Sequence, residues 1–100
     1  MLDLRPEHLE IVRELLAAHA AECEVLAFGS RVNGTSTRTS DLDLALRGAA
    51  RLGIARIALL KEVFEESTLP FRVDLVDWHD ASPEFRAVIE RCNEPIRKPG

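Results

Sequence analysis

The chain has 100 residues, of which 46% are hydrophobic and 30% charged, with 13 basic against 17 acidic side chains. This composition excludes a disordered chain, and the net charge of −4 argues against a protein that wraps nucleic acid or coats an anionic membrane, so no direct nucleic-acid binding is expected. No apolar run reaches the ~20 residues of a membrane span, and residues 1–5 lack the layout of a signal peptide, so we expect a cytoplasmic protein without membrane contact.

The first 28 residues predict a helix followed by a strand. Apolar side chains recur at spacings of three and four over residues 6–21, and Pro6 suits the first position of such a helix. Residues 25–28 then form a short apolar run that ends at Gly29. A run that is this short and stops at a glycine is more typical of a buried strand than of a helix.

A polar loop and a second strand follow. Residues 30–40 are rich in serine and threonine and lack an apolar period, so they predict a loop that begins with one helical turn. Residues 41–46 read Asp-Leu-Asp-Leu-Ala-Leu, and this alternation with a period of two predicts a strand. The leucines of the strand share one face, and Asp41 and Asp43 share the other.

The next segments predict a helix and a third strand. Residues 50–66 have the apolar spacing of a helix, although Gly53 lies near its beginning. Residues 71–76 alternate in the manner of a strand, which places Arg72 and Asp74 on one face.

The last helix and the end of the chain complete one domain. Ser82 as the cap, followed by a proline, predicts a helix over residues 82–92. Residues 95–100 contain two prolines and predict a flexible C-terminal tail. Since the sequence shows no repeat and no linker, residues 1–94 predict a single small α/β sandwich, in which helices pack on a short mixed sheet of about three to four strands.

Gly29 and Ser30 stand where the first strand gives way to the helical turn. A glycine at this place lets the backbone approach a polyphosphate closely, and the serine adds a hydroxyl and amide donors at the positive end of the turn. The pair therefore predicts a seat for the phosphates of a nucleotide. Arg31 and Arg38 flank the seat and are candidates to contact the phosphates, although arginines in a polar loop are more often solvated.

Three aspartates predict a magnesium site beside this seat. Asp41 and Asp43 lie two residues apart on one strand, so their Cα atoms are ~6.6 Å apart and both carboxylates can converge on shared metal ions. Hard oxygen ligands of this kind suit Mg²⁺. In phosphoryl transfer with two metals, one ion activates the attacking hydroxyl, and Asp74 is the candidate ligand for that ion. Asp74 joins the pair only if the register of its strand turns it to the same face.

Each part of the pattern also has a structural explanation. A Gly-Ser pair after a strand is a common turn sequence, and an Asp-x-Asp pair often lies on the solvent-exposed face of a half-buried strand. Arg72 could neutralise Asp74 without any metal. The ten residues between Ser30 and Asp41, together with the strand order, favour a combined nucleotide site. The two cysteines and three histidines are not spaced as metal ligands.

Two stretches of the sequence carry a resemblance to a known family. The stretch G-S-x-x-x-G begins at Gly29, and the stretch S-D-x-D-L begins at Ser40. Together they resemble the signature of the DNA polymerase β-like nucleotidyltransferase superfamily, and the order of elements from residue 4 to about residue 93 fits as well. Within this superfamily the short chain resembles the minimal nucleotidyltransferases, the MntA-like antitoxins that accompany HEPN-domain toxins.

The resemblance implies a role for each candidate residue. Gly29 and Ser30 would bind the triphosphate of ATP, the substrate. Asp41 and Asp43 would bind the nucleotide through two Mg²⁺ ions, and Asp74 would be the third metal ligand. The three aspartates would then be the catalytic residues.

The resemblance also implies a reaction and a partner. The reaction would be the transfer of AMP from ATP to a tyrosine of a HEPN-type RNase toxin, which makes the chain a protein adenylyltransferase antitoxin. Because no second domain is predicted to grip a nucleobase or an acceptor, we expect the remaining walls to come from another chain in a hetero-oligomer. The main alternative is a non-catalytic antitoxin that neutralises its partner by complex formation alone. A small-molecule acceptor is the third hypothesis, and it lacks a predicted substrate-binding domain.

Overall fold

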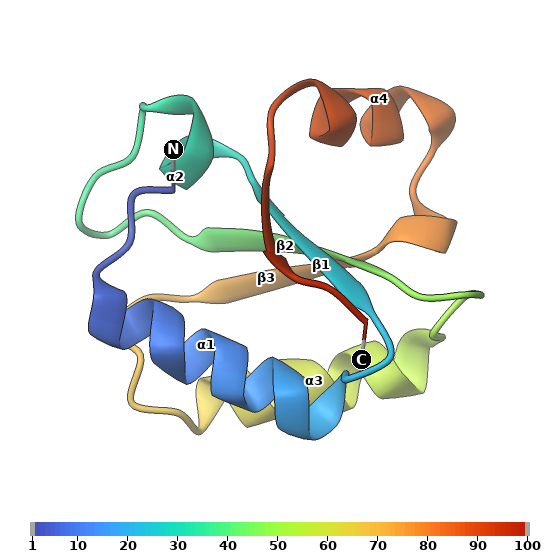
Figure 1. Ribbon diagram of the computed structural model, residues 1–100, viewed down its shortest axis with the longest axis horizontal. Helices are drawn as coiled ribbons and strands as arrows, with labels where there is room; N and C mark the ends of the chain where they lie inside the picture. Colours follow the sequence, from blue (N-terminus) through green and yellow to red (C-terminus); the bar gives the residue numbers. More distant parts are fainter. Residues whose placement is uncertain (1, 100) are drawn as a thin grey trace.

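Within residues 2–99, which are the residues that the structure describes, four strands form one mixed sheet between helices (Figure 1). The elements of this computed structural model, in chain order, are α1 (Pro6–His19), β1 (Glu24–Phe28), α2 (Ser30–Asn33), β2 (Leu42–Arg47), α3 (Ile54–Glu65), β3 (Val73–Asp77), the 3-10 helix η1 (Trp78–Asp80), α4 (Pro83–Arg91) and β4 (Glu94–Arg97). The predicted fold class, a small α/β sandwich with a short mixed sheet, is confirmed. In this part of the chain no helix has both the length and the apolar character that crossing a membrane requires.

The strand order and register decide which residues become neighbours across the sheet. The order is β3-β2-β1-β4, in which β1 runs antiparallel to β2 and β4, whereas β2 and β3 run parallel and are joined through α3. The antiparallel register places Phe28 opposite Asp43, and the parallel register places Asp43 opposite Asp74. Since directly opposed residues share a face, these three side chains form one row on one face of the sheet.

The sheet face toward α1 and α3 carries the main hydrophobic core. The leucines of β2 lie on this face, as their alternation predicts, and all three are fully buried: Leu42, Leu44 and Leu46. Figure 1 shows α1 and α3 together on this side, below the sheet. Burying a leucine side chain stabilises the fold by about 1.5–3 kcal/mol. The core therefore fixes β2 firmly, and with it the alternate residues, which point to the opposite face.

α4 covers part of the opposite face and builds a second, smaller core there. This core consists of Leu26, Phe28, Ala45, Trp78 and Ile89. α4 begins as predicted, with Pro83 in its first turn and the Ser82 hydroxyl accepting a hydrogen bond of 3.1 Å from the amide of Phe85. α2 lies at the other end of the same face (Figure 1).

Residues 95–97 belong to the sheet, which corrects the prediction of a flexible tail over residues 95–100. β4 pairs with β1, and Ile96 is 5% exposed within the main core. The guanidinium of Arg13 also donates a hydrogen bond of 3.1 Å to the carbonyl of Ile96. Pro95 is tolerated because β4 is an edge strand, where a position without an amide proton can face away from the neighbouring strand.

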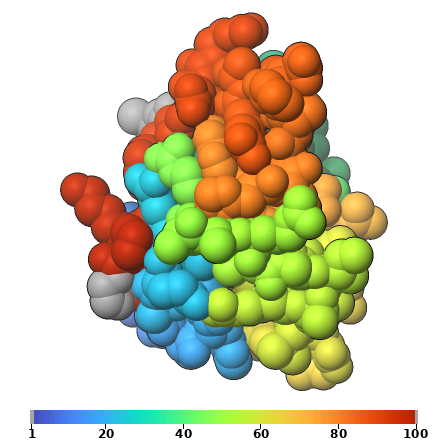
Figure 2. Space-filling view, turned by 90° about the vertical axis from the view of Figure 1, so that its right-hand side faces the viewer, coloured from blue at the N-terminus to red at the C-terminus, as the bar shows by residue number. Residues whose placement is uncertain are grey.

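The loop between β2 and α3 is held by residues at the end of β3. The buried carboxylate of Asp77 accepts hydrogen bonds from the amides of Leu52 (2.8 Å) and Gly53 (3.3 Å). Gly53 has a φ of 95°, which a helix cannot contain, so α3 begins at Ile54 and not at residue 50 as predicted. Figure 2 shows this side of the molecule, where the loop and the first turns of α3 (green) meet the segment from η1 to α4 (orange).

Candidate active site

The structure brings the three predicted aspartates to one face of the sheet. Asp43 lies on β2, Asp41 precedes this strand by one residue, and Asp74 lies on β3 directly opposite Asp43. All three side chains are half-buried. The sequence left open whether Asp74 faces the other two, and the parallel register places it beside Asp43.

The charges of these carboxylates act on one another. The pKa of Asp43 is raised above its ordinary value, first by burial and then by the negative charges of Asp74 and Asp41. As the side chains stand, no three His, Cys, Asp or Glu residues within residues 2–99 gather around a single metal position. Mg²⁺ is usually bound through one or two carboxylates together with water and substrate phosphates, so three protein ligands around one position are not required. The donor set therefore fits divalent cations.

Arg72, which directly precedes β3, contacts Asp41 and not Asp74, the partner that the sequence suggests. The guanidinium lies 3.5 Å from an oxygen of Asp41, and the two side chains are 74% and 41% exposed. An ion pair as exposed as this contributes at most about 1 kcal/mol. The explanation that Arg72 alone neutralises the third aspartate is therefore not supported.

The turn at Gly29 closes directly over Asp43. Gly29 has a φ of 80°, and a Cβ added to it would lie 3.2 Å from Cγ of Asp43 and closer still to one carboxylate oxygen. The Gly29 carbonyl accepts hydrogen bonds of 3.0 Å from the amides of Val32 and Asn33, which form the single turn of α2. The helical turn predicted after Gly29 is thus present, and Ser30 begins it. Glycine is required here both for the backbone conformation and for the close approach to the carboxylate.

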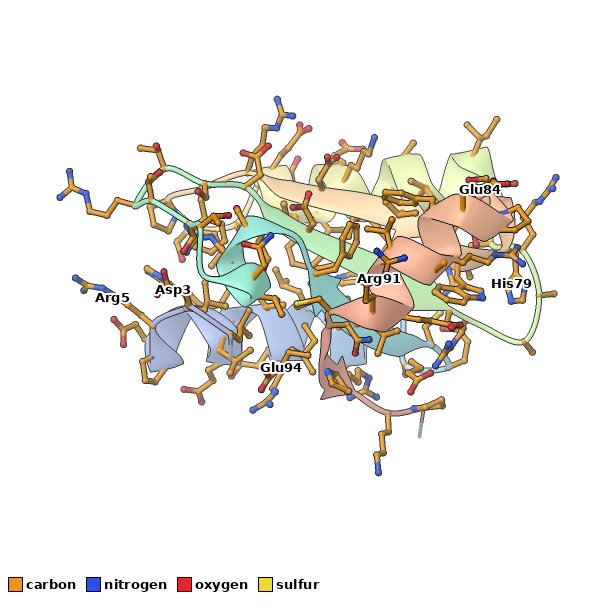
Figure 3. The ribbon with its side chains drawn as sticks, turned by 90° about the horizontal axis from the view of Figure 1, so that it is seen from above. Asp3, Arg5, His79, Glu84, Arg91 and Glu94 are labelled. Atoms are coloured by element: carbon orange, nitrogen blue, oxygen red, sulfur yellow. The ribbon has the colours of Figure 1, made fainter. Side chains whose placement is uncertain are left out.

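Arg31 has a structural role that the sequence does not reveal. Its side chain is 6% exposed, and its guanidinium donates hydrogen bonds of 3.0 Å to the carbonyls of Ser40 and Asp3. It also lies 4.4 Å from the ring centre of Phe71. Arg31 thus ties α2 to the residue that precedes Asp41 and to the N-terminal segment, where Figure 3 labels Asp3. A buried arginine and a solvated arginine look alike in a polar loop sequence, so spacing alone could not identify this residue.

We expect the substitution Arg31→Ala to destabilise the protein by about 1–3 kcal/mol, because the buried side chain of Arg31 is lost together with its hydrogen bonds to the carbonyls of Ser40 and Asp3. Arg31→Lys should recover only part of this loss, because a compact ammonium group lacks the planar set of donors with which the guanidinium reaches several carbonyls at once. Chemical denaturation of the purified variants measures the effect. Arg38→Ala, at an exposed position of the same loop, is the matched control. Equal stabilities of the Arg31→Ala and Arg38→Ala variants would contradict this role of Arg31.

The fold and the site together define a class of protein. A glycine turn lies against a carboxylate on the neighbouring strand, and a second carboxylate stands beside the first on a parallel strand. This combination fits the nucleotidyltransferase class that the two sequence stretches at Gly29 and Ser40 resemble. The sequence profile of the family described as polymerase beta, nucleotidyltransferase, matches residues 10–98, and the chain belongs to this family.

Individual relatives agree with this assignment. The chain is 44% identical over 97 residues to the probable protein adenylyltransferase MntA of Haemophilus influenzae, a match that covers 97% of this chain and 85% of the relative. A crystal structure of a toxin-antitoxin with AMP-PNP shares 27% identity and a TM-score of 0.78, over 89% of this chain and 72% of that chain. A second solved structure is that of the tri-AMPylated Shewanella oneidensis HEPN toxin in complex with MNT antitoxin. Its matching chain has 22% identity and a TM-score of 0.75, over 94% of this chain and 72% of that chain, and shows the likeness of fold.

Proposed function

We propose that this chain is a protein adenylyltransferase, which transfers AMP from ATP to a tyrosine hydroxyl of a HEPN-domain toxin and so acts as its antitoxin. The observation that carries the proposal is the row formed by Asp43 and Asp74, with the Gly29 turn directly against Asp43. The likeness to MntA, and the solved toxin-antitoxin with AMP-PNP, support the acceptor class and the nucleotide. Because the reaction consumes ATP, we place the protein in the cytoplasm.

Each residue of the site has a part in this reaction. Gly29 and Ser30 hold the phosphates of ATP at the end of β1. Asp41 and Asp43 would hold the Mg²⁺ ions, two on this proposal, and Asp74, on the neighbouring strand, would be the third ligand. When bound there, Mg²⁺ would supply positive charge that offsets the triphosphate and would make the acceptor hydroxyl easier to deprotonate. The tyrosine oxygen forms a bond to the α-phosphorus while the bond to the bridging oxygen breaks, so that pyrophosphate leaves and the hydroxyl proton passes to the solvent.

The consequence for the toxin follows from the added group. An AMP unit brings a negative charge and considerable bulk to the tyrosine, and both would hinder the binding of RNA at an RNase site. The acceptor must reach the carboxylates from the solvent, and the half-buried state of all three aspartates leaves them accessible to a second protein. We assign this activity to the domain predicted over residues 1–94, completed by β4.

A non-catalytic antitoxin that acts by complex formation alone is the second candidate. It makes no use of three acidic side chains on one face, although burial and the charges of Asp74 and Asp41 raise the pKa of Asp43 and oppose folding at neutral pH. In the enzyme hypothesis the three carboxylates bind metal ions, which explains why they lie together, and we prefer it for that reason.

The test is the intact mass of the HEPN partner after incubation with this chain, ATP and Mg²⁺. We expect a gain of one or more AMP units, and no gain with the Asp41→Asn/Asp43→Asn double variant. Size-exclusion chromatography of the variant with its partner checks that the complex still forms. An unchanged mass of the partner in a stable wild-type complex would favour the non-catalytic antitoxin.

A further inference from the structure

Two apolar side chains of α4 remain accessible on the face of the sheet that carries the aspartates. Phe85 is 37% exposed and Val88 is 51% exposed, whereas Ile89 of the same helix is fully buried in the second core. The ring of Phe85 packs edge-to-face on the ring of Phe28, with 5.7 Å between the ring centres and an angle of 83° between the planes. This contact orients the Phe85 ring without burying it.

The contact with Phe28 also places Phe85 close to the site. Phe28 lies directly opposite Asp43 in the register of β1 and β2, and the two side chains share a face. Phe85 therefore lies at the β1 end of the row, with the Phe28 side chain between it and Asp43 and with Asp74 on the far side of Asp43. We call Phe85 and Val88 the acceptor wall.

The two sides of the aspartate row differ in character. The backbone turn at Gly29 lies against Asp43 on the side of α2. Residues of β2 and β3 further from this turn, Ala45 and Val76, belong to the second core beneath α4. Figure 3, which looks down on this face, shows α2 and α4 on the two sides of the exposed part of the sheet, with Glu84 and Arg91 marking the two ends of α4.

The geometry of phosphoryl transfer assigns these two sides to different reactants. In an in-line displacement the attacking oxygen approaches the phosphorus from the side opposite the leaving group. If the phosphates of ATP lie at Gly29 and Ser30, as the proposed function has it, pyrophosphate leaves toward α2. The acceptor then enters from the side of α4, where the acceptor wall stands. This step rests on the proposed function.

We propose that the acceptor wall positions the acceptor tyrosine: Phe85 packs against the tyrosine ring, and Val88 contacts the chain beside it. Aromatic rings pair favourably in edge-to-face or offset arrangements, and the edge-to-face contact with Phe28 leaves part of the Phe85 ring accessible for such a pair. An open apolar surface suits a side chain that protrudes from another protein, whereas a nucleobase is usually enclosed in a pocket. Phe85 is thus a positioning residue that favours tyrosine over an aliphatic hydroxyl.

The test is steady-state AMP transfer to the HEPN partner by the full chain. For Phe85→Ala we expect the KM for the partner to rise about tenfold, because an aromatic contact with the acceptor is lost. The kcat and the KM for ATP should change less than about twofold. Phe85→Tyr, which retains a ring, should stay close to the wild type. Leu59→Ala is the matched control, because Leu59 is another accessible apolar residue, 57% exposed, and lies on α3 across the sheet. Circular dichroism melting shows whether each variant is folded.

The outcomes separate this inference from the proposed function. A rise in the KM for ATP with an unchanged KM for the partner would mean that Phe85 holds the nucleobase, and it would overturn the inference. Unchanged kinetics of Phe85→Ala, with an active wild-type chain, would overturn the inference and leave the proposed function standing. A wild-type chain that transfers no AMP would overturn the proposed function and this inference with it.

Discussion

The substitution Asp43→Asn is expected to abolish AMP transfer and, at the same time, to stabilise the protein in the absence of divalent ions. Asp43 lies between Asp41 and Asp74, so on the proposed function its loss would remove the central metal ligand. We expect a decrease in kcat of at least about 1000-fold. Asparagine keeps the shape of the side chain and removes its charge, so the repulsion from Asp74 and Asp41 disappears. The melting temperature in EDTA should rise by about 2–4 °C at pH 7.

The pH dependence of this stabilisation has a definite sign. The pKa of Asp43 is raised in the folded protein, so the folded state binds this proton more tightly than the unfolded chain does. The cost of the ionised carboxylate is therefore greatest at neutral pH and is lost as the pH falls to the ordinary value of 3.8. The difference in melting temperature between Asp43→Asn and the wild type should narrow from pH 7 to pH 4. A variant that melts below the wild type at pH 7 in EDTA would show that the carboxylate has favourable partners instead.

The substitution Gly29→Ala is expected to impair both folding and catalysis. A Cβ at this position meets the Asp43 carboxylate, and the φ of 80° is unfavourable for alanine. We expect a loss of about 1–3 kcal/mol in the free energy of unfolding. Displacement of Asp43 and of the turn should lower kcat by about 100-fold, because a shift of this size misplaces the reacting groups. Denaturation with urea and steady-state AMP transfer measure the two effects.

Gly53→Ala is the matched control for Gly29→Ala. Gly53 has a similar φ of 95°, but a Cβ there meets nothing within 4 Å. The control therefore carries the backbone strain without the collision, and Gly53 lies at the start of α3, away from the aspartates. We expect a smaller loss of stability, about 1 kcal/mol, and AMP transfer close to the wild type. If both variants lost activity to the same degree, general strain and not contact with Asp43 would be the cause.

The sequence predicts the parts of the site that depend on local periodicity. The alternation of residues 41–46 separates leucines from aspartates, and the structure confirms that the leucines are buried on the opposite face. Gly29 and Ser30 stand at the end of an apolar run, which correctly predicts a strand followed by a helical turn. These features involve neighbours along the chain, where spacing determines geometry.

Features that depend on distant segments could not be predicted in the same way. The neighbourhood of Asp43 and Asp74 is set by the parallel register of β2 and β3, which a shift of one residue would destroy. The sequence predicts a flexible tail over residues 95–100, although residues 95–97 belong to β4. Local propensity cannot show that an edge position beside β1 is available for pairing. Arg31 is buried because the segments that contain Asp3, Ser40 and Phe71 pack around it. These segments are far apart in the sequence, so no local pattern predicts the contact.

The position of β3 at the edge of the sheet gives the site an unequal architecture. Asp43 belongs to β2, which has a strand on either side, and Asp41 directly precedes this strand, whereas Asp74 belongs to a strand that is paired on one side only. Edge strands open more readily than central strands, so brief fraying of β3 would withdraw the third carboxylate and leave the other two in place. A molecule in that state could retain ATP yet would activate the acceptor hydroxyl poorly. On the proposed function, nucleotide binding would depend mainly on β2 and the Gly29 turn, whereas activation of the acceptor hydroxyl would depend on the pairing of the single outer strand β3.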